Sequence, residues 1–337
     1  MRFGLFGSAS AARGGLPAEA ARGYLDYVET NVEAEALGFH ASFLVEHHFT
    51  GIGQVSATLA LQEWVAARTT TLRLGTAVLV LPWHNPVLLA EQVATIDLLS
   101  GGRLDLGIGR GYRWSEFEGF GMPPEEAAPR FEEALEVLLR ALSSDERFSH
   151  QGRFWNFRDI LVEPPPAQRP HPPVWMAAAG EEGARRVAAR GFNLLLDQFA
   201  APERIGLAIA AYRAETEARG RRFDPMQVAV ARNIRLADTP EAVEEARAQQ
   251  ARQHAGMLAL SRAPDPSRAG QSSHILGYAE TLEATLAHAL IGPPEAILAG
   301  LEALAAQGVG YVLVNAGRAP RDMLRRFARE VMPACAG

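Results

Sequence analysis

Three ionisable side chains follow an apolar run in the stretch FLVEHHFTG, residues 43–51: Glu46, His47 and His48. An imidazole titrates near neutral pH, so a histidine here can act as an acid, a base or a hydrogen-bond donor. Because side chains alternate along an extended chain, the two imidazoles should point in opposite directions. Taken alone, the pair is better explained by packing or hydrogen bonding at the end of a strand than by catalysis.

The same alternation disfavours a metal site, because divergent imidazoles do not chelate one ion together. The sequence contains no HExxH motif, and its single cysteine, Cys335, lies near the C-terminal end. Neither a cysteine metal cluster nor a disulfide framework is therefore expected.

Two other segments carry small residues where an apolar run ends. LGIGRG places Gly109, Arg110 and Gly111 after one run, and PVWMAAAGEEG (173–183) leads from another into a helical pattern. Glycines let a backbone approach a ligand closely, an arginine offers donors to a phosphate, and a helix start binds anions. Together with EHH, these segments favour a ligand site at the ends of several strands.

Alternating strand and helix patterns place these segments. Strands are expected at 2–7, 39–45, 72–82, 103–109, 173–179, 192–197, 226–237 and 310–317, each followed by a helical pattern. About eight such units predict a closed parallel (β/α)8 barrel of the TIM type, with functional residues at the C-terminal strand ends. An open doubly wound sheet is the alternative fold.

Two segments interrupt the alternation of a single domain spanning residues 1–337. Residues 146–172 combine aromatic residues with a proline-rich return, which indicates an inserted hairpin. Residues 257–291 contain APDPSRAGQSS and are expected to form a long loop that acts as a lid.

Composition excludes several classes of protein. The 337 residues are 48% hydrophobic, with 33 Lys+Arg against 39 Asp+Glu and a net charge of −6, so we expect no nucleic-acid partner. No apolar run reaches the roughly 18 residues of a membrane helix, and the N-terminus lacks a secretory signal pattern. We expect a cytoplasmic protein that does not bind membranes.

Motifs along the chain resemble the bacterial luciferase-like family of flavin-dependent monooxygenases. The matching segments are RFGLF (2–6), EHHFT (46–50), GTAVLVLP (75–82), AEQ…D…SGGR (90–103), GIGRG (107–111), PVW (173–175) and IGPPE (291–295). The resemblance implies a barrel that binds reduced FMN, activates O₂ as a flavin hydroperoxide and oxygenates a small organic substrate. It also implies a homodimer and a separate flavin reductase.

The resemblance implies residue roles as well. His47 matches the catalytic histidine, with His48 structural and Glu46 orienting, and the Ala77–Val78 peptide bond is expected to be cis beneath the flavin ring. The phosphate is expected at Arg110 and at the turn that contains Ala179 and Gly180. The full set of expected cofactor residues is Ala77, Val78, Gly109, Arg110, Tyr112, Ala178, Ala179, Gly180 and Gly183.

This chain departs from the family pattern at three places. Gly109 stands where luciferase has cysteine, the phosphate turn lacks Ser and Thr, and the luciferase segment LPTAHP is LPWHNP, which moves the histidine to His84. A turn without hydroxyl groups fits a weakly held, exchangeable flavin.

Two alternatives to the monooxygenase stay open. One is a deazaflavin-dependent oxidoreductase that transfers hydride, and the other is a non-catalytic flavin-binding barrel. The substrate is expected to be apolar, from the aromatic residues near the strand ends, Phe49, Trp83, Tyr112 and Trp114.

Overall fold

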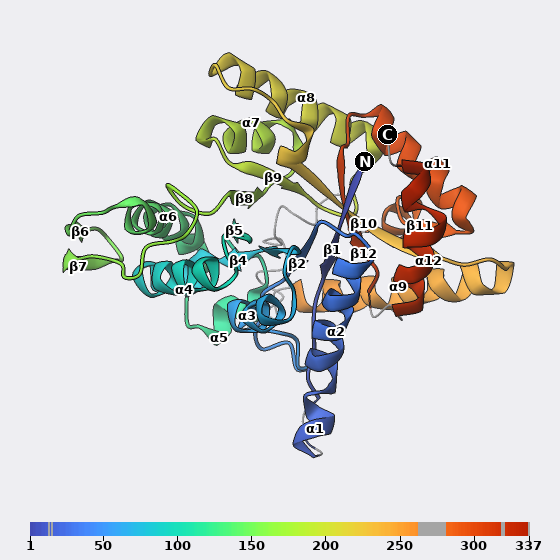
Figure 1. The fold of residues 1–337 in the computed structure, drawn as a ribbon, viewed down its shortest axis with the longest axis horizontal. Coiled ribbons are helices and arrows are strands. Elements are labelled where there is room, and N and C mark those ends of the chain that lie inside the picture. Colours follow the sequence, from blue (N-terminus) through green and yellow to red (C-terminus); the bar gives the residue numbers. More distant parts are fainter. Residues whose placement is uncertain (13, 15, 262–280, 318–320, 336–337) are drawn as a thin grey trace. The chain divides into compact units, whose positions relative to one another are not determined.

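The computed structural model describes residues 1–12, 14, 16–261, 281–317 and 321–335 (Figure 1). Its main sheet follows the hydrogen-bonded order β10–β12–β1–β2–β3–β5–β8–β9, and β9 pairs again with β10, while β11 pairs with β10 and β4 with β5. The fold is therefore the expected eight-stranded parallel (β/α)8 barrel.

The described strands are β1 (Arg2–Gly7), β2 (Ala41–Leu44), β3 (Arg73–Thr76), β4 (Leu79–Val80), β5 (Leu104–Gly109), β6 (Phe148–Gln151), β7 (Asn156–Ile160), β8 (Val174–Ala177), β9 (Asn193–Leu196), β10 (Val228–Leu236), β11 (Leu290–Gly292) and β12 (Tyr311–Asn315). The α-helices are α1 (Pro17–Ala20), α2 (Arg22–Ala36), α3 (Thr58–Arg68), α4 (Pro86–Leu99), α5 (Trp114–Gly119), α6 (Ala127–Ser143), α7 (Gly180–Arg190), α8 (Pro202–Ala218), α9 (Pro240–Ser261), α10 (Leu282–Ala287), α11 (Pro294–Ala306) and α12 (Arg321–Glu330).

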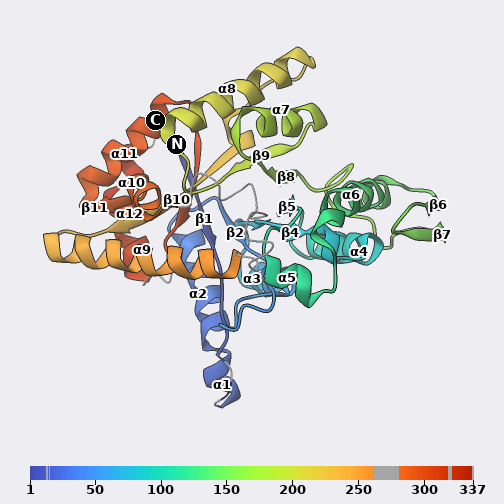
Figure 2. The ribbon, with the colours of Figure 1, turned by 180° about the vertical axis from the view of Figure 1, so that it is seen from behind.

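The chain divides into two compact units, which are described one at a time. Unit 1 comprises residues 1–7, 33–43 and 176–337, and unit 2 comprises residues 8–32 and 44–175. In unit 1, β12 pairs in parallel with both β1 and β10. Helices α7 and α8 run side by side in both views (Figures 1 and 2).

Aromatic packing fixes α12 against β1 in unit 1. Phe327 of α12 meets Phe3 edge to face, with ring centroids 5.1 Å apart, and it stacks on Phe39. All three side chains are buried. Burial of one such side chain contributes about 1.5–3 kcal/mol, so this contact holds the last described α-helix on the first strand.

In unit 2, two residues fix the start of helix α4. The Asn85 side chain accepts hydrogen bonds from the backbone N–H groups of Val87 and Leu88, and Pro86 occupies the first turn. A side-chain cap of this kind contributes about 1 kcal/mol. Helix α6 packs beside α4 through its buried apolar face, which includes the expected residues Phe131, Leu135, Leu138 and Leu142.

Two features in this part of the chain differ from expectation, and one agrees with it. The strand predicted at 72–82 is two strands, β3 and β4, separated by Ala77 and Val78, and the short helix α5 was not expected. The hairpin predicted within 146–172 is confirmed by the antiparallel pair β6–β7.

The expected loop at 257–291 is partly wrong, because α9 extends to Ser261 and α10 and β11 occupy its end; its centre, 262–280, lies outside the described residues. Within the described part of the chain, no helix combines the length and the apolar character that crossing a bilayer would require.

Candidate functional site

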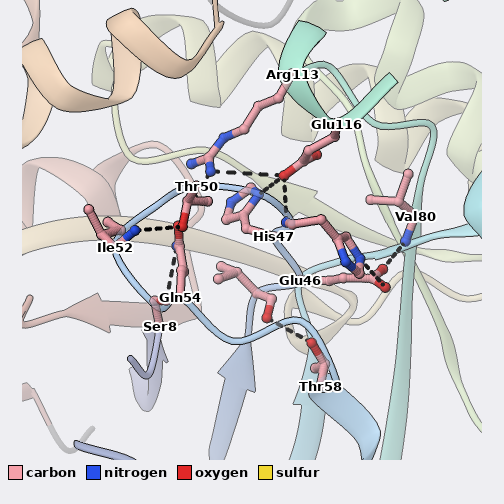
Figure 3. A network of polar contacts seen from close by, with 12 residues as sticks. Ser8, Glu46, His47, Thr50, Ile52, Gln54, Thr58, Val80, Arg113 and Glu116 are labelled. Carbon is pink, nitrogen blue, oxygen red and sulfur yellow. Dashed lines mark hydrogen bonds and ion pairs between the residues drawn. The ribbon is translucent and has the colours of Figure 1, made fainter. Parts of the chain in front are cut away.

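A part-buried hydrogen bond joins the chain just after β2 to helix α5. The Nδ1 atom of His47 lies 3.0 Å from Oε1 of Glu116, and the two side chains are 11% and 2% exposed (Figure 3). The same carboxylate oxygen accepts a 3.0 Å hydrogen bond from the backbone N–H of His48. Because a carboxylate only accepts, this contact places the proton of a neutral His47 on Nδ1 and leaves Nε2 able to accept.

The charge state of His47 follows from its surroundings. Burial lowers the pKa of His47, and the nearby Arg113 guanidinium lowers it further, while Glu116 opposes both effects. Because the net direction is downward from 6.5, His47 is neutral at pH 7. A neutral imidazole fixed by a carboxylate can accept a proton or a hydrogen bond through Nε2.

Gln54 and Ser8, which lie far from Glu116 in the sequence, are linked to it through Arg113. Arg113 Nη1 lies 3.9 Å from Glu116 Oε1, and it also donates to Gln54 Oε1 at 3.3 Å. Gln54 in turn donates to Ser8 Oγ at 3.0 Å. Figure 3 shows this chain of contacts reaching His47.

The second histidine, His48, contacts a different carboxylate, that of Glu46. Glu46 Oε1 lies 3.1 Å from Nε2 of His48 and 2.7 Å from Nε2 of His84, and Glu46 Oε2 accepts from the Val80 backbone N–H at 2.6 Å (Figure 3). Burial alone would raise the pKa of Glu46, but these hydrogen bonds and the charge of His84 lower it to about 2. Glu46 is therefore ionised and buried, and it joins residues 46–48 to residues 80–84 within unit 2.

The two adjacent histidines thus separate as the alternation of side chains predicts. His47 contacts Glu116, and His48 contacts Glu46, which is the grouping expected for an orienting Glu46. The relocated His84 joins the same Glu46 carboxylate. Sequence reasoning missed Glu116, Arg113 and Gln54; the acidic residue in SEFEG, just beyond GIGRG, is the signal that was available.

Ala77 and Val78 lie between β3 and β4, and both are half-buried. The peptide bond between them is cis, as expected. Val78 also accounts for a departure from the family pattern, because a Cβ on Gly109 would lie 2.5 Å from Val78 Cγ2. No side chain fits at position 109 unless Val78 moves.

Arg110 and Tyr112 follow β5 in unit 2. Arg110 is exposed and makes no hydrogen bond or ion pair with the described residues. The Tyr112 ring meets the His47 imidazole edge to face, with centroids 6.2 Å apart. The end of β5 therefore offers a free guanidinium and an aromatic ring beside the buried histidine.

The expected phosphate turn belongs to unit 1. Helix α7 begins at Gly180, which has a φ of +66°, and its N-cap Ala179 makes no side-chain capping bond. A Cβ on Gly183 would lie 3.1 Å from the Cβ of Ala178, so this first turn is tightly packed. Its uncapped backbone N–H groups are suited to an anion.

A model of the luciferase-like monooxygenase family matches residues 1–310 of this chain. The chain belongs to this family. One curated member, the FMNH₂-dependent dimethylsulfone monooxygenase of Pseudomonas putida, is 30% identical over 192 residues, which cover 56% of this chain and 52% of that protein. The chain spans about half the length of the curated relatives it matches.

Solved structures match the fold of the whole chain. Monooxygenase RslO1 from Streptomyces bottropensis has a TM-score of 0.77 and 26% identity, with 100% of both chains covered. A secondary alcohol dehydrogenase that depends on F420, a deazaflavin, has a TM-score of 0.78 and 18% identity, covering 100% of this chain and 99% of that one. At that identity the second likeness shows the fold alone.

Proposed function

We propose that this luciferase-like protein is an oxidoreductase that uses reduced FMN and O₂ to oxygenate a small, apolar organic substrate. The observation that carries the proposal is the buried His47–Glu116 pair, with Tyr112 at its edge, at the place where the family motif has its essential histidine. The FMNH₂ dependence named for the Pseudomonas relative supports the choice of flavin.

Residues of the chain fit FMN at three places. The exposed Arg110 guanidinium, which has no described partner, is suited to a phosphate, and the uncapped first turn of α7 offers backbone N–H groups to an anion. Half-buried Ala77 and Val78 present apolar surface to a flat ring. When bound, reduced FMN would supply the activation of O₂.

The protein contributes the acceptor, its orientation and a dry environment. Glu116 holds Nδ1–H of His47, so that Nε2 presents a lone pair to a proton or a hydroxyl group. Because burial keeps His47 neutral at pH 7, it acts as a base or acceptor and does not add a positive charge. Arg113, which is 5% exposed and lies against Glu116, helps to shield the same pair from solvent.

The aromatic residues expected near the substrate divide into two groups. Trp114 is buried, whereas Trp83 and Phe49 both contact Phe120, with centroid distances of 5.0 Å in each case. We propose that the substrate is recognised by this partly exposed aromatic group.

Two partners complete the proposal. Because the reduced flavin must come from elsewhere, a separate flavin reductase supplies it. A second copy of the chain is proposed to dock on α3 and α4 of unit 2, which contact each other and expose Trp64, Leu88 and Leu99.

Anaerobic binding tests this assignment before any substrate is known. We would titrate the protein with reduced FMN, reduced riboflavin and a reduced deazaflavin, and repeat the titrations with Arg110→Ala. Loss of a charge-assisted phosphate contact of about 1.5–3 kcal/mol should weaken FMN binding roughly ten- to a hundred-fold and leave riboflavin binding unchanged.

Exposed Arg158, which has no described partner, provides the control variant Arg158→Ala. Equal FMN affinity in Arg110→Ala and the parent protein would remove Arg110 from the phosphate site. Tighter binding of the deazaflavin than of FMN would replace the proposed oxygenation with hydride transfer.

A further inference from the structure

Strand β10 of unit 1 carries two buried arginines with different surroundings. Arg232 and Arg235 are 1% and 8% exposed. The Asp197 carboxylate provides a counter-charge for Arg232, whose Nη2 also donates to the Ala200 carbonyl at 2.5 Å. Burial lowers the pKa of Arg235 to about 10, and no acidic group among the described residues opposes this effect. At neutral pH Arg235 is therefore a buried cation that lacks a described counter-ion.

The hydrogen bonds of Arg235 use only part of its guanidinium. Nη1 donates to the carbonyl oxygens of Ile234 and Asn315 at 2.7 and 2.6 Å, and these contacts fix the orientation of the group. Nη2 is buried and has no hydrogen-bond partner among the described residues. A buried charged donor without a partner is unfavourable, so an acceptor at Nη2 would be favoured.

A second donor lies on the same face of β10. Asn233 precedes Arg235 by two residues, so both side chains leave the same face of the strand, with Cα atoms about 7 Å apart. Asn233 is 1% exposed, and its Nδ2 also lacks a partner among the described residues. Its register partner in β12 is Asn315, whose carbonyl holds Arg235.

Gly317 lies next to the guanidinium of Arg235. Its backbone N–H donates to Asn315 Oδ1 at 3.0 Å, and it has a φ of +63°. A Cβ on Gly317 would lie 2.4 Å from Arg235 Nη2, so a side chain at this position would displace the guanidinium. The ends of β10 and β12 together hold the two donors.

We propose that Arg235 Nη2 and Asn233 Nδ2 bind the carboxylate of a small organic acid in unit 1. One guanidinium and one neutral amide match a monoanion, whereas a phosphate dianion would need more donors or a second cation. Barrel enzymes hold their ligands at the C-terminal strand ends, where both residues lie. This site is proposed for unit 1 in its own right and does not depend on the proposed oxygenation.

Calorimetry on the full chain without flavin tests the site independently of catalysis. The probes are benzoate and hexanoate, their neutral amides, and inorganic phosphate. At least one carboxylate should bind ten-fold or more tightly than its amide, and Arg235→Gln should remove that preference. Arg222→Gln, which removes an equal charge from an exposed position of the same unit, should retain it.

A second variant keeps the test decisive if Arg235→Gln does not fold. Asn233→Asp places an internal carboxylate beside Arg235, so it should raise the melting temperature and weaken carboxylate binding at least ten-fold. The proposal is overturned if neither carboxylate exceeds its amide, if phosphate binds in preference to both, or if binding persists in Asn233→Asp. Because no flavin is present, failure of FMN or O₂ chemistry would leave this result unaffected.

Discussion

The imidazole of His47 and the carboxylate of Glu116 meet at 3.0 Å although 69 positions separate them in the chain. Replacement of Glu116 by glutamine keeps the shape of the side chain and removes the charge that raises the pKa of His47. Glu116→Gln should therefore lower the pKa of His47 further and reduce turnover by about 10²-fold or more with little loss of FMN affinity, while the glutamine Oε1 can still accept from Nδ1–H.

Nitrogen-resolved NMR of the imidazole measures the tautomer and the pKa directly, which a purely structural role of Glu116 would not change. Glu118→Gln on the same helix is exposed and provides the control. An unchanged His47 titration in Glu116→Gln would show that the charge of Glu116 does not act on the imidazole.

Glu46 should make the protein sensitive to acid. Because its pKa lies near 2 in the folded chain against 4.5 ordinarily, folding favours its ionised form. The resulting stability is complete above about pH 4.5 and is lost as the pH falls through 2; the gap corresponds to about 3 kcal/mol. Glu46→Gln should therefore lower the free energy of unfolding at pH 7 and flatten its decline between pH 5 and 2. Urea denaturation at several pH values measures both effects, and parallel curves for variant and parent would contradict them.

The effects of substitutions at Val78 and Gly109 on stability should depend on each other. A methyl group at position 109 collides with Val78 Cγ2, so Gly109→Ala should destabilise unit 2 by about 1–3 kcal/mol, as expected for an overpacked core. Truncation of Val78 to alanine should recover most of that loss, and a double-mutant cycle from denaturation curves measures the coupling. Gly7→Ala, at a position where the added Cβ meets nothing within 4 Å, is the matched control. Additive effects of the two substitutions would show that the contact does not exclude side chains.

Trp64 provides a test of the proposed dimer. Its side chain is 54% exposed on α3, and Leu99 on the neighbouring α4 is 72% exposed. A charge placed in an apolar interface is costly, so Trp64→Glu should convert dimers to folded monomers in sedimentation at micromolar concentration. A parent protein that sediments as a monomer would exclude the interface.

Much of the fold could be predicted from the sequence, whereas part of the site could not, and the reasons are physical. The start of helix α4 carries a local signal in the sequence, since Asn85 caps the helix and Pro86 follows it. The break between β3 and β4 was hidden, because the apolar residues 77–81 all fit a strand and Pro82 marks its end. Glu116 could not be assigned from sequence alone, since its role depends on a contact with a residue 69 positions away. The residue pattern singled out Arg110 and the two adjacent histidines, and the resemblance then selected His47 of the pair.

Mixing the reduced FMN complex with O₂ in a stopped-flow spectrophotometer tests the central claim most directly. The account predicts that the parent protein delays flavin reoxidation and shows a transient oxygenated-flavin absorbance. His47→Ala should shorten the lifetime of that transient and release peroxide while retaining FMN, whereas His48→Ala should mainly lower stability, since it loses a contact with Glu46. Reoxidation of the complex at the rate of free reduced FMN, or loss of the transient in His48→Ala with none in His47→Ala, would contradict the account.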